Sequence, residues 1–168
     1  LHDLGRKEEA EDAFKKSIAI KEKAHGADAP ELAAVYRNYG LLLDDLERVS
    51  EAQAYTRRSL AIEIKTLGED HPTVARQRSN LAVSYKLDGR TEEAIGLWEA
   101  ALKSLKGRVN PSNETLVGIK FLLASQLRFT PGRLDEAYGL ASEAITAIRA
   151  GFVASAERGR GKDSHGND

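Results

Sequence analysis

The stretch Gly26-Ala27-Asp28-Ala29-Pro30 returns 42 residues later as Gly68-Glu69-Asp70-His71-Pro72, with Gly, Asp and Pro in the same places. The pair Glu51-Ala52 returns at the same distance as Glu93-Ala94. A fixed period of this length is typical of stacked repeats, in which each unit buries its apolar face only against its neighbours. The sequence therefore predicts a repeat array rather than one globular core.

The same register continues in both directions along the chain. Upstream, Glu9-Ala10 lies 42 residues before Glu51-Ala52, and downstream Ala82 leads to Ala124 at the same distance. We predict an array over residues 1–150, with an incomplete repeat at 1–28 and full repeats at 29–70, 71–112 and 113–150. Residues 151–168 have almost no apolar side chain after Val153. Because burial there cannot offset the entropy of ordering, we expect a disordered polar tail.

The third junction is a variant of the first two. Val109-Asn110-Pro111-Ser112 falls on Leu67-Gly68-Glu69-Asp70, so that Asn stands for Gly and Ser for Asp. These residue types substitute best for a left-handed helix terminator and for an N-cap. We therefore expect Asn110 to end one helix and Ser112 to cap the next.

Each period contains two stretches whose apolar residues recur at helical steps of three and four. No stretch alternates in the way that a half-buried strand does. The sequence therefore predicts an all-α fold of antiparallel helix pairs, with about seven helices. Their expected bounds are about 7–25, 30–46, 50–67, 72–88, 91–106, 113–128 and 134–150.

Composition excludes several classes of protein. Of the 168 residues 30% are charged, but the net charge is −1, which gives no basic balance for nucleic acid or an anionic membrane. There is no cysteine, so neither a disulfide nor a thiolate metal site is expected. The apolar runs are too short to cross a bilayer. We expect a cytoplasmic protein and, because the chain contains no methionine, a segment of a longer one.

Small and aromatic residues recur in the same order within a period. They are Tyr39-Gly40, Leu43 and Ala52, followed by Leu81-Ala82, Tyr85, Gly89, Ala94, Trp98 and Ala101. This order resembles the tetratricopeptide repeat (TPR), which places Leu-Gly, Tyr, Ala, an aromatic residue and Ala at these relative positions. The usual repeat has about 34 residues, and the longer period here is similar to the variant of kinesin light chains and many bacterial regulatory proteins. The resemblance implies a right-handed superhelical solenoid that acts as a protein–protein interaction scaffold.

Small residues at four of these positions explain how the helices would pair. Gly40 and Ala82 lie on first helices of their repeats, and Ala52 and Ala94 on second helices. A small side chain lets two helix backbones approach closely. Trp98 is expected to fill the core rather than to stack on a ligand.

In this family the first helices line a concave groove for an extended peptide, and an asparagine contacts the peptide backbone. The resemblance implies that role for Asn38 and Asn80, because an amide both donates and accepts hydrogen bonds. The alternatives are an asparagine that bridges helices within the array and arginines on a solvated face. The other residues expected on the groove are Arg37, Leu41, Arg76, Ser79, Val83, Phe121, Ser125 and Arg128.

Two residues depart from the family pattern. Arg78 and Lys120 occupy a position that is usually apolar. Either their charged ends extend past the helix pair to water, or the groove is locally different.

We find no constellation for catalysis or metal binding. The four histidines lie in helix entries, loops or termini, and no metal-binding, phosphate-binding or nucleophile motif occurs. The sequence therefore predicts no enzyme, no cofactor and no metal.

The predicted partner is a protein or peptide with acidic side chains. Two other functions stay open. One is self-association through the opening helix, whose face of Ala10, Phe14 and Ile18 lacks a pairing helix. The other is an accessory region of a larger enzyme such as a kinase, ATPase or protease.

Overall fold

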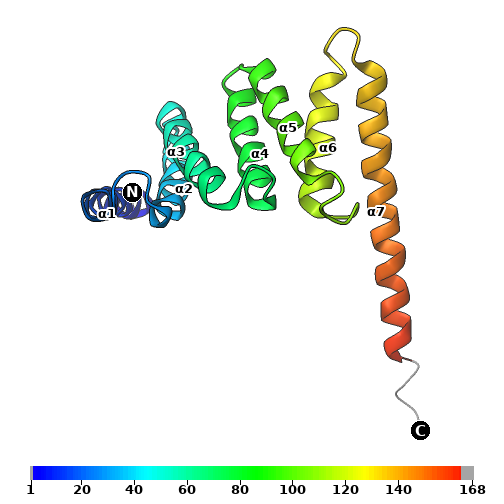
Figure 1. The fold of residues 1–168 in the computed structure, drawn as a ribbon, viewed down its shortest axis with the longest axis horizontal. Coiled ribbons are helices and arrows are strands. Elements are labelled where there is room, and N and C mark those ends of the chain that lie inside the picture. Colours follow the sequence, from blue (N-terminus) through cyan, green and yellow to red (C-terminus); the bar gives the residue numbers. More distant parts are fainter. Residues whose placement is uncertain (1, 164–168) are drawn as a thin grey trace. The chain divides into compact units, whose positions relative to one another are not determined.

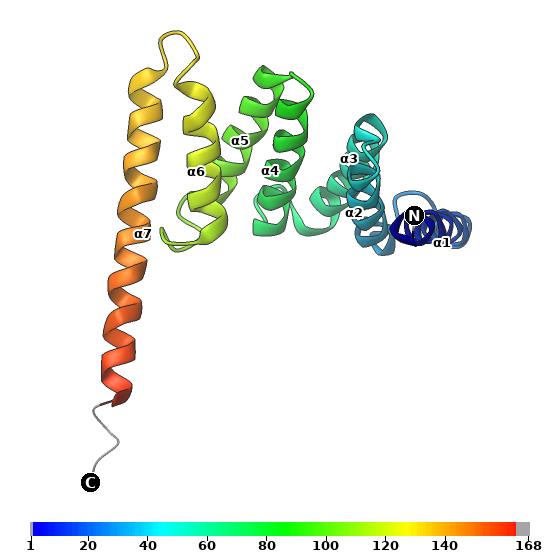
Figure 2. The same ribbon diagram turned by 180° about the vertical axis from the view of Figure 1, so that it is seen from behind.

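The structure, a computed structural model, describes residues 2–163, with side chains described for 6–153. This part of the chain contains seven α-helices and no strand, which confirms the predicted all-α fold (Figures 1 and 2). Six of the seven predicted starts and six of the seven ends agree with the structure within one residue. The helices are α1 (His2–His25), α2 (Pro30–Asp45), α3 (Val49–Leu67), α4 (Pro72–Leu87), α5 (Thr91–Leu105), α6 (Glu114–Leu127) and α7 (Leu134–Asp163).

The exceptions are the start of α1 and the end of α7. The last helix continues to Asp163, so residues 151–163 are helical where the sequence predicted a tail without regular structure. Two alanines, two arginines and one glutamate there have high helix propensity and favour continuation of the helix despite three glycines. The rest of the predicted tail, residues 164–168, lies outside the described residues.

The turns between helices repeat as the sequence does. Gly26 and Gly68 both have φ of +86°, a left-handed conformation that only glycine adopts without strain. His71 caps α4, because its Nδ1 accepts a hydrogen bond from the backbone N–H of Thr73. Pro30 and Pro72 begin α2 and α4, where a missing N–H costs nothing.

The variant junction differs from the prediction. Gly107, with φ of +72°, takes the left-handed position after α5, and Asn110 does not. The N-cap of α6 is Asn113, whose Oδ1 accepts from the N–H of Leu116. Asn110 instead accepts from the N–H of Ser112 within the loop. The left-handed residue thus lies three positions before Asn110, whereas the N-cap Asn113 lies 42 residues after His71, the N-cap of α4.

The chain forms two compact units, Leu1–Ser104 and Leu105–Asp168. In the first unit α1 packs on α2, α2 on α3, and α3 on α4; in the second, α6 packs on α7. The α2–α3 crossing is close at Gly40, where an added Cβ would lie 2.9 Å from Thr56 Oγ1 and 3.3 Å from the Ala52 carbonyl oxygen. Of the other small or aromatic positions of the pattern, Gly89 is exposed, and the buried ones include Ala52, Ala82, Ala94, Trp98 and Ala101.

Aromatic rings link the first three helices. Phe14 of α1 stacks on Tyr39 of α2 at 5.7 Å between ring centroids, and Tyr39 meets Tyr55 of α3 edge-on at 4.6 Å. Such pairs add about 0.5–1.5 kcal/mol each beyond the area they bury. The neighbouring Ile18 is 6% exposed. On this face of α1, Ile18 is therefore covered, whereas Phe14 and Ala10 are only partly buried.

Candidate binding surface

A buried carboxylate organises the polar centre between α2, α3 and α4. Glu63 of α3 lies between apolar positions of its helix and accepts a hydrogen bond from Arg37 of α2 at 2.7 Å. Only 5% of its side chain is exposed, and its second oxygen has no hydrogen-bond partner. Burial raises the pKa of Glu63. Three groups lower this pKa and partly offset the effect of burial, in decreasing size the Arg37 charge, the neighbouring Gln77 amide and the more distant Arg76 charge. The guanidinium of Arg37 is thus already engaged by an acid of the chain.

Gln77 of α4 completes this centre. Its side chain is 1% exposed, and its Nε2 is buried without an acceptor that meets hydrogen-bond geometry. An unsatisfied buried donor of this kind costs about 1–3 kcal/mol. Sequence analysis missed both Glu63 and Gln77. The sequence does contain a signal for Gln77. Buried apolar residues of a helix recur at steps of three and four, and Gln77 occupies such a step between Val74 and Leu81.

Gln77 also lines a narrow cleft of about 60 Å³ between α2, α3 and α4. Three of the residues predicted for the groove, Arg37, Leu41 and Asn80, come together there. Asp44 adds a negative charge at the same place. The remaining lining residues are Thr56, Leu81 and Ser84.

The two asparagines lie in equivalent places but have different surroundings. Both side chains are exposed. Asn80 donates a long hydrogen bond of 3.5 Å to Gln77 Oε1, whereas Asn38 makes no side-chain hydrogen bond with any described residue. Asn38 lines a separate pocket between α1 and α2. Neither amide is held by strong contacts within the first unit.

The other predicted residues of α4 divide into surface and core. Arg76 is exposed, and Val83 is partly buried. Ser79 is 8% exposed, and its Oγ accepts a hydrogen bond from Trp98 Nε1 at 3.2 Å. The serine therefore serves the core, because a buried indole N–H needs an acceptor.

The second unit places its predicted residues around an apolar pocket of about 330 Å³ between α6 and α7. Phe121, Ser125 and Arg128 belong to it, but the Ser125 hydroxyl is already used, since it donates to the Leu122 carbonyl at 2.7 Å. The Arg128 guanidinium lies 4.3 Å from the ring centre of Phe129, which is 73% exposed. The other lining residues are Ala124, Leu134, Ala137, Tyr138 and Ala141.

Arg78 and Lys120, the residues that depart from the family pattern, have buried stems and paired ends. Arg78 is 11% exposed and donates to the Glu69 carbonyl oxygen and to Ser104 Oγ. Lys120 is 12% exposed and pairs with Glu143 of α7 at 2.9 Å. The apolar stem of each residue thus replaces the usual hydrophobic side chain, and its charged end is paired within the chain rather than extended to water.

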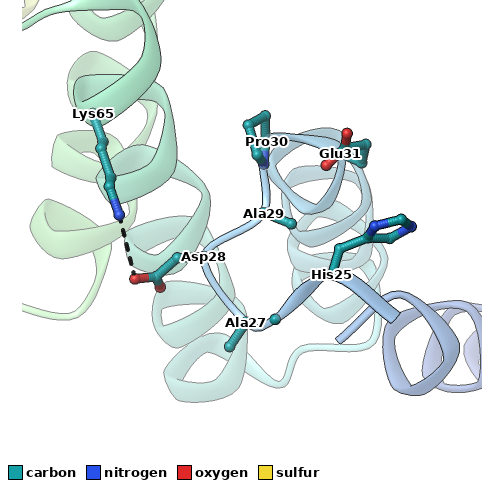
Figure 3. Close-up of a pocket in the computed structure, with 8 residues that line it drawn as sticks. His25, Ala27, Asp28, Ala29, Pro30, Glu31 and Lys65 are labelled. Carbon is teal, nitrogen blue, oxygen red and sulfur yellow. Dashed lines mark ion pairs between the residues drawn. The ribbon is translucent and has the colours of Figure 1, made fainter. Parts of the chain in front are cut away.

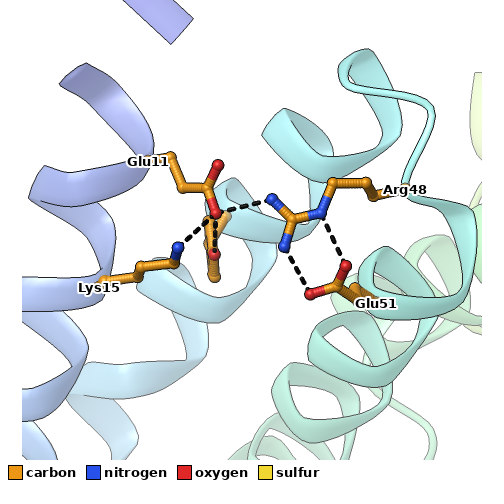
Figure 4. Close-up of polar contacts among 5 residues, drawn as sticks. Glu11, Lys15, Arg48 and Glu51 are labelled. Atoms are coloured by element: carbon orange, nitrogen blue, oxygen red, sulfur yellow. Dashed lines mark hydrogen bonds and ion pairs between the residues drawn. The ribbon is translucent and has the colours of Figure 1, made fainter. Parts of the chain in front are cut away.

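A network of charges joins α1 to the start of α3 (Figure 4). Glu11 of α1 pairs with Lys15 at 2.6 Å and with Arg48 at 2.7 Å, and it accepts from the Tyr39 hydroxyl at 3.2 Å. Lys15 first and then Arg48 hold the pKa of Glu11 at about 2. Arg48 also makes two hydrogen bonds with Glu51. This network fastens helices together and faces no cleft.

A wide, open hollow lies along the loop between α1 and α2 (Figure 3). Its lining is mostly loop backbone and small side chains, with an ion pair of 3.8 Å between the exposed Lys65 and Asp28. Exposed pairs of this length contribute little, so the hollow offers no organised polar site. Among residues 6–153 no cluster of three metal-ligating side chains occurs. Over the same part of the structure, no helix has the length and apolar character needed to span a bilayer.

Comparison with known families matches this helical pattern twice. Two models described as tetratricopeptide repeat match residues 1–65 and residues 74–107, which together make up more than half of the chain. The chain belongs to the tetratricopeptide repeat family. Repeats of this family indicate, in general, a scaffold for protein–protein interaction. No curated protein matches the TPR chain at a significant level.

Solved structures share its fold. BtubC (BKLC) from P. vanneervenii is 21% identical with a TM-score of 0.67, over 92% of the TPR chain and 59% of its own length. A Podosopora anserina protein described as a kinesin light chain with nearly identical TPR-like repeats is 21% identical with a TM-score of 0.65, and the match covers 92% of the TPR chain and 70% of the other protein. A single-residue variant of that protein is 24% identical with a TM-score of 0.73, and the match covers 88% of the TPR chain and 69% of the variant. The TPR chain thus spans about three fifths of the first of these structures and has the kinesin-light-chain-like TPR solenoid fold.

Proposed function

We propose that the TPR chain binds an extended, acidic peptide segment of a partner protein, with Asn38 and Asn80 on the peptide backbone. The observation that carries the proposal is the cleft between α2, α3 and α4, which is lined by the exposed Asn80, whose amide makes only one long hydrogen bond, of 3.5 Å, to Gln77. A peptide backbone in the cleft can exchange hydrogen bonds with the Asn80 amide. Each such contact is worth about 0.5–1.5 kcal/mol net.

The preference for acidic side chains rests on Arg76 more than on Arg37. Arg37 is neutralised by Glu63, and Asp44 repels a carboxylate near the cleft. Arg76 is exposed on α4 and has no ion pair with a described residue. Its planar guanidinium is suited to a carboxylate.

The second unit contributes separately through the apolar pocket of Phe121. Its wall also includes Leu134 and Tyr138, which are 48% and 68% exposed. Covering these groups with an apolar side chain of a partner contributes about 25 cal/mol to the free energy of binding for each Å² of apolar surface removed from water. Arg128 at the rim offers a further contact for a carboxylate.

A peptide-library screen followed by titration tests the proposal. The double variant Asn38→Ala, Asn80→Ala should weaken the best ligand by about tenfold or more, because two amide contacts are lost. Arg76→Ala should weaken binding and flatten its dependence on salt. Arg149→Ala, which removes an exposed charge of α7, is the matched control and should leave binding unchanged. Ligands that ignore all three asparagine and arginine substitutions, with helix content intact, would place the partner elsewhere.

Self-association through α1 remains a second candidate with less support, since α2 covers Ile18 and part of Phe14. Light scattering over a range of concentrations tests it, and a mass that stays that of one chain removes it. An accessory role in a larger enzyme rests on sequence outside these residues.

A further inference from the structure

The last helix, α7, carries an apolar stripe that no described residue covers. Its members recur at alternating steps of four and three, which is the spacing of a coiled-coil seam. Five of the six have 38–73% of their surface exposed, and the sixth is partly buried. The helix packs on α6 through a different side, where Ala144 and Ala147 meet Val117. The stripe consists of Leu134, Tyr138, Ala141, Ile145, Ile148 and Phe152.

The stripe corresponds to the face of α3 that meets α4. The two helices align at an offset of 85 residues, because the buried Ala52 of α3 then corresponds to the buried Ala137 of α7. At this offset Gln53, which donates to Ser84 of α4 at 3.3 Å, corresponds to Tyr138. The stripe thus lies where, in the first unit, the next repeat packs its first helix.

The residues that would form such a helix in the register of the repeat belong to α7 itself. In the first unit α3 ends before Gly68, and the next helix begins at Pro72. The corresponding positions are 153 and 157, and α7 passes through both and continues to Asp163 (Figures 1 and 2). The stripe is therefore left open by residues that the structure describes, and its occupant must have another origin.

The stripe is complementary to itself when two copies of α7 lie antiparallel. A single register then aligns all six residues, and two-fold symmetry makes each contact occur twice. The smallest residue, Ala141, lies nearest the centre, where it lets the two helix backbones approach closely. The opposed pairs are Leu134 with Phe152, Tyr138 with Ile148, and Ala141 with Ile145 of the second copy.

Charged residues beside the stripe favour the same register. Asp135 and Arg149 directly follow Leu134 and Ile148, so they lie on one flank of the stripe. Both are exposed, and neither forms an ion pair with a described residue. Antiparallel pairing brings Asp135 of each copy beside Arg149 of the other, because matching flanks then meet. In a parallel pair these positions lie on opposite sides of the seam, so the charges do not meet.

The apolar pocket between α6 and α7 lies on the same surface. Leu134, Tyr138 and Ala141 belong to the stripe and also line this pocket of about 330 Å³. In the antiparallel register, Ile148 and Phe152 of the second copy lie against these walls. Phe152 is 73% exposed in the single chain and gains apolar surroundings in the pair. Exposed apolar surface of this kind commonly marks a contact between proteins.

We propose that the stripe of α7 is a dimer interface, at which two copies of the chain pair through antiparallel α7 helices with two Asp135–Arg149 ion pairs. The proposal rests on α7 and its contacts, so it does not depend on the binding of a peptide by the TPR chain.

Variants with reversed charge test the register. Asp135→Arg leaves two positive charges on the flank, and Arg149→Asp leaves two negative ones. By sedimentation equilibrium, each should dimerise about fivefold or more weakly than the unchanged chain, because two ion pairs become repulsions. An equimolar mixture should recover the original affinity as a heterodimer, because every arginine then faces an aspartate. The double variant Asp135→Arg, Arg149→Asp should dimerise like the unchanged chain for the same reason.

A charge within the stripe tests its place. Ile145→Glu should abolish the dimer, because a carboxylate would be buried without a partner at the centre of the contact. Ile20→Glu, at a position of α1 that is 68% exposed, is the matched control and should leave the dimer intact. Light scattering after size-exclusion chromatography measures the mass, and circular dichroism checks that both variants keep their helix content.

A chain that stays a single copy up to about 1 mM overturns the proposal. So does a mixture of Asp135→Arg and Arg149→Asp chains that associates no better than either chain alone. A dimer that Phe14→Ser dissociates and Ile145→Glu does not would also overturn it, because the contact would then lie on α1.

Discussion

At the scale of single residues, the most perturbed carboxylate fastens α1 to the array. Glu11 ionises far more readily in the folded chain than in the unfolded one, since its pKa falls from 4.5 to about 2. A depressed pKa means that the ionised form stabilises the fold. This contribution is fully present above about pH 4.5 and is lost as the pH falls towards 2.

Glu11→Gln should therefore lower the free energy of unfolding near neutral pH and have progressively less effect in acid. Urea unfolding of the two proteins at about pH 6, 4 and 2.5 measures this difference. The exposed Glu8→Gln is the control and should change little at any of these pH values. A difference for Glu11→Gln that stays constant down to about pH 2.5 would contradict the assigned role.

Ser79 gives a second prediction at this scale. Ser79→Ala leaves the buried Trp98 N–H without its acceptor and should cost about 1–3 kcal/mol of stability. Thermal unfolding followed by circular dichroism measures it, with Ser50→Ala at an exposed position as the control. If Ser79 served only a ligand, as its groove position suggested, the two variants would melt alike.

At the scale of elements, close crossings decide which helices pair. Gly40 lies on a helix face that meets α3, whereas Gly96 of α5 is exposed and has nothing within 4 Å of an added Cβ. Alanine is favoured over glycine in a helix by about 0.8–1 kcal/mol when no clash occurs. The two glycines therefore respond to the same substitution with opposite sign.

Gly40→Ala should destabilise the chain by about 1–3 kcal/mol, because Ala52 and Thr56 must shift. Gly96→Ala should stabilise it by about 0.5–1 kcal/mol. Chemical denaturation of both variants measures the contrast. Stabilisation by both substitutions would show that the α2–α3 crossing is looser than the structure has it.

The buried alanines offer a test of the same kind. Ala52→Leu or Ala94→Leu should overpack its helix contact and cost about 1–3 kcal/mol. Both positions are almost completely buried, at 1% and 0% exposure. An unchanged melting temperature for both would refute their assignment to close contacts.

At the scale of the whole molecule, the helices that pack on each other within each unit are neighbours in sequence. Stability of such an array is approximately a sum of repeat and neighbour terms, so a local lesion has local consequences. Gly40→Leu should increase amide hydrogen exchange in α2 and α3 much more than in α6 and α7. A uniform increase across all seven described helices would indicate a single cooperative unit instead.

The sequence by itself determined the repeat, the all-α fold and most helix bounds. These follow from local signals, since Gly68, Pro72 and the spacing of apolar residues act within one or two turns of their own position. The same reasoning failed for residues 151–163, where the low apolar content outweighed helix propensity in the prediction. It also misplaced the cap of α6, because the prediction aligned Ser112 with Asp70, whereas the N-cap of α4 is His71, whose counterpart 42 residues later is Asn113.

Only the tertiary structure decided how the polar residues are used. Arg37 was predicted to meet a ligand's carboxylate, but Glu63, 26 residues away, lies within 2.7 Å of it. Ser79 was predicted on the groove, but Trp98 takes its hydroxyl. Both partners, Glu63 and Trp98, come from the next helix. The spacing of residues in a helix specifies which face each residue occupies, but it does not specify which residues of a neighbouring helix contact that face. Contacts between helices depend on crossing angle and side-chain conformation, and these arise only when the helices pack.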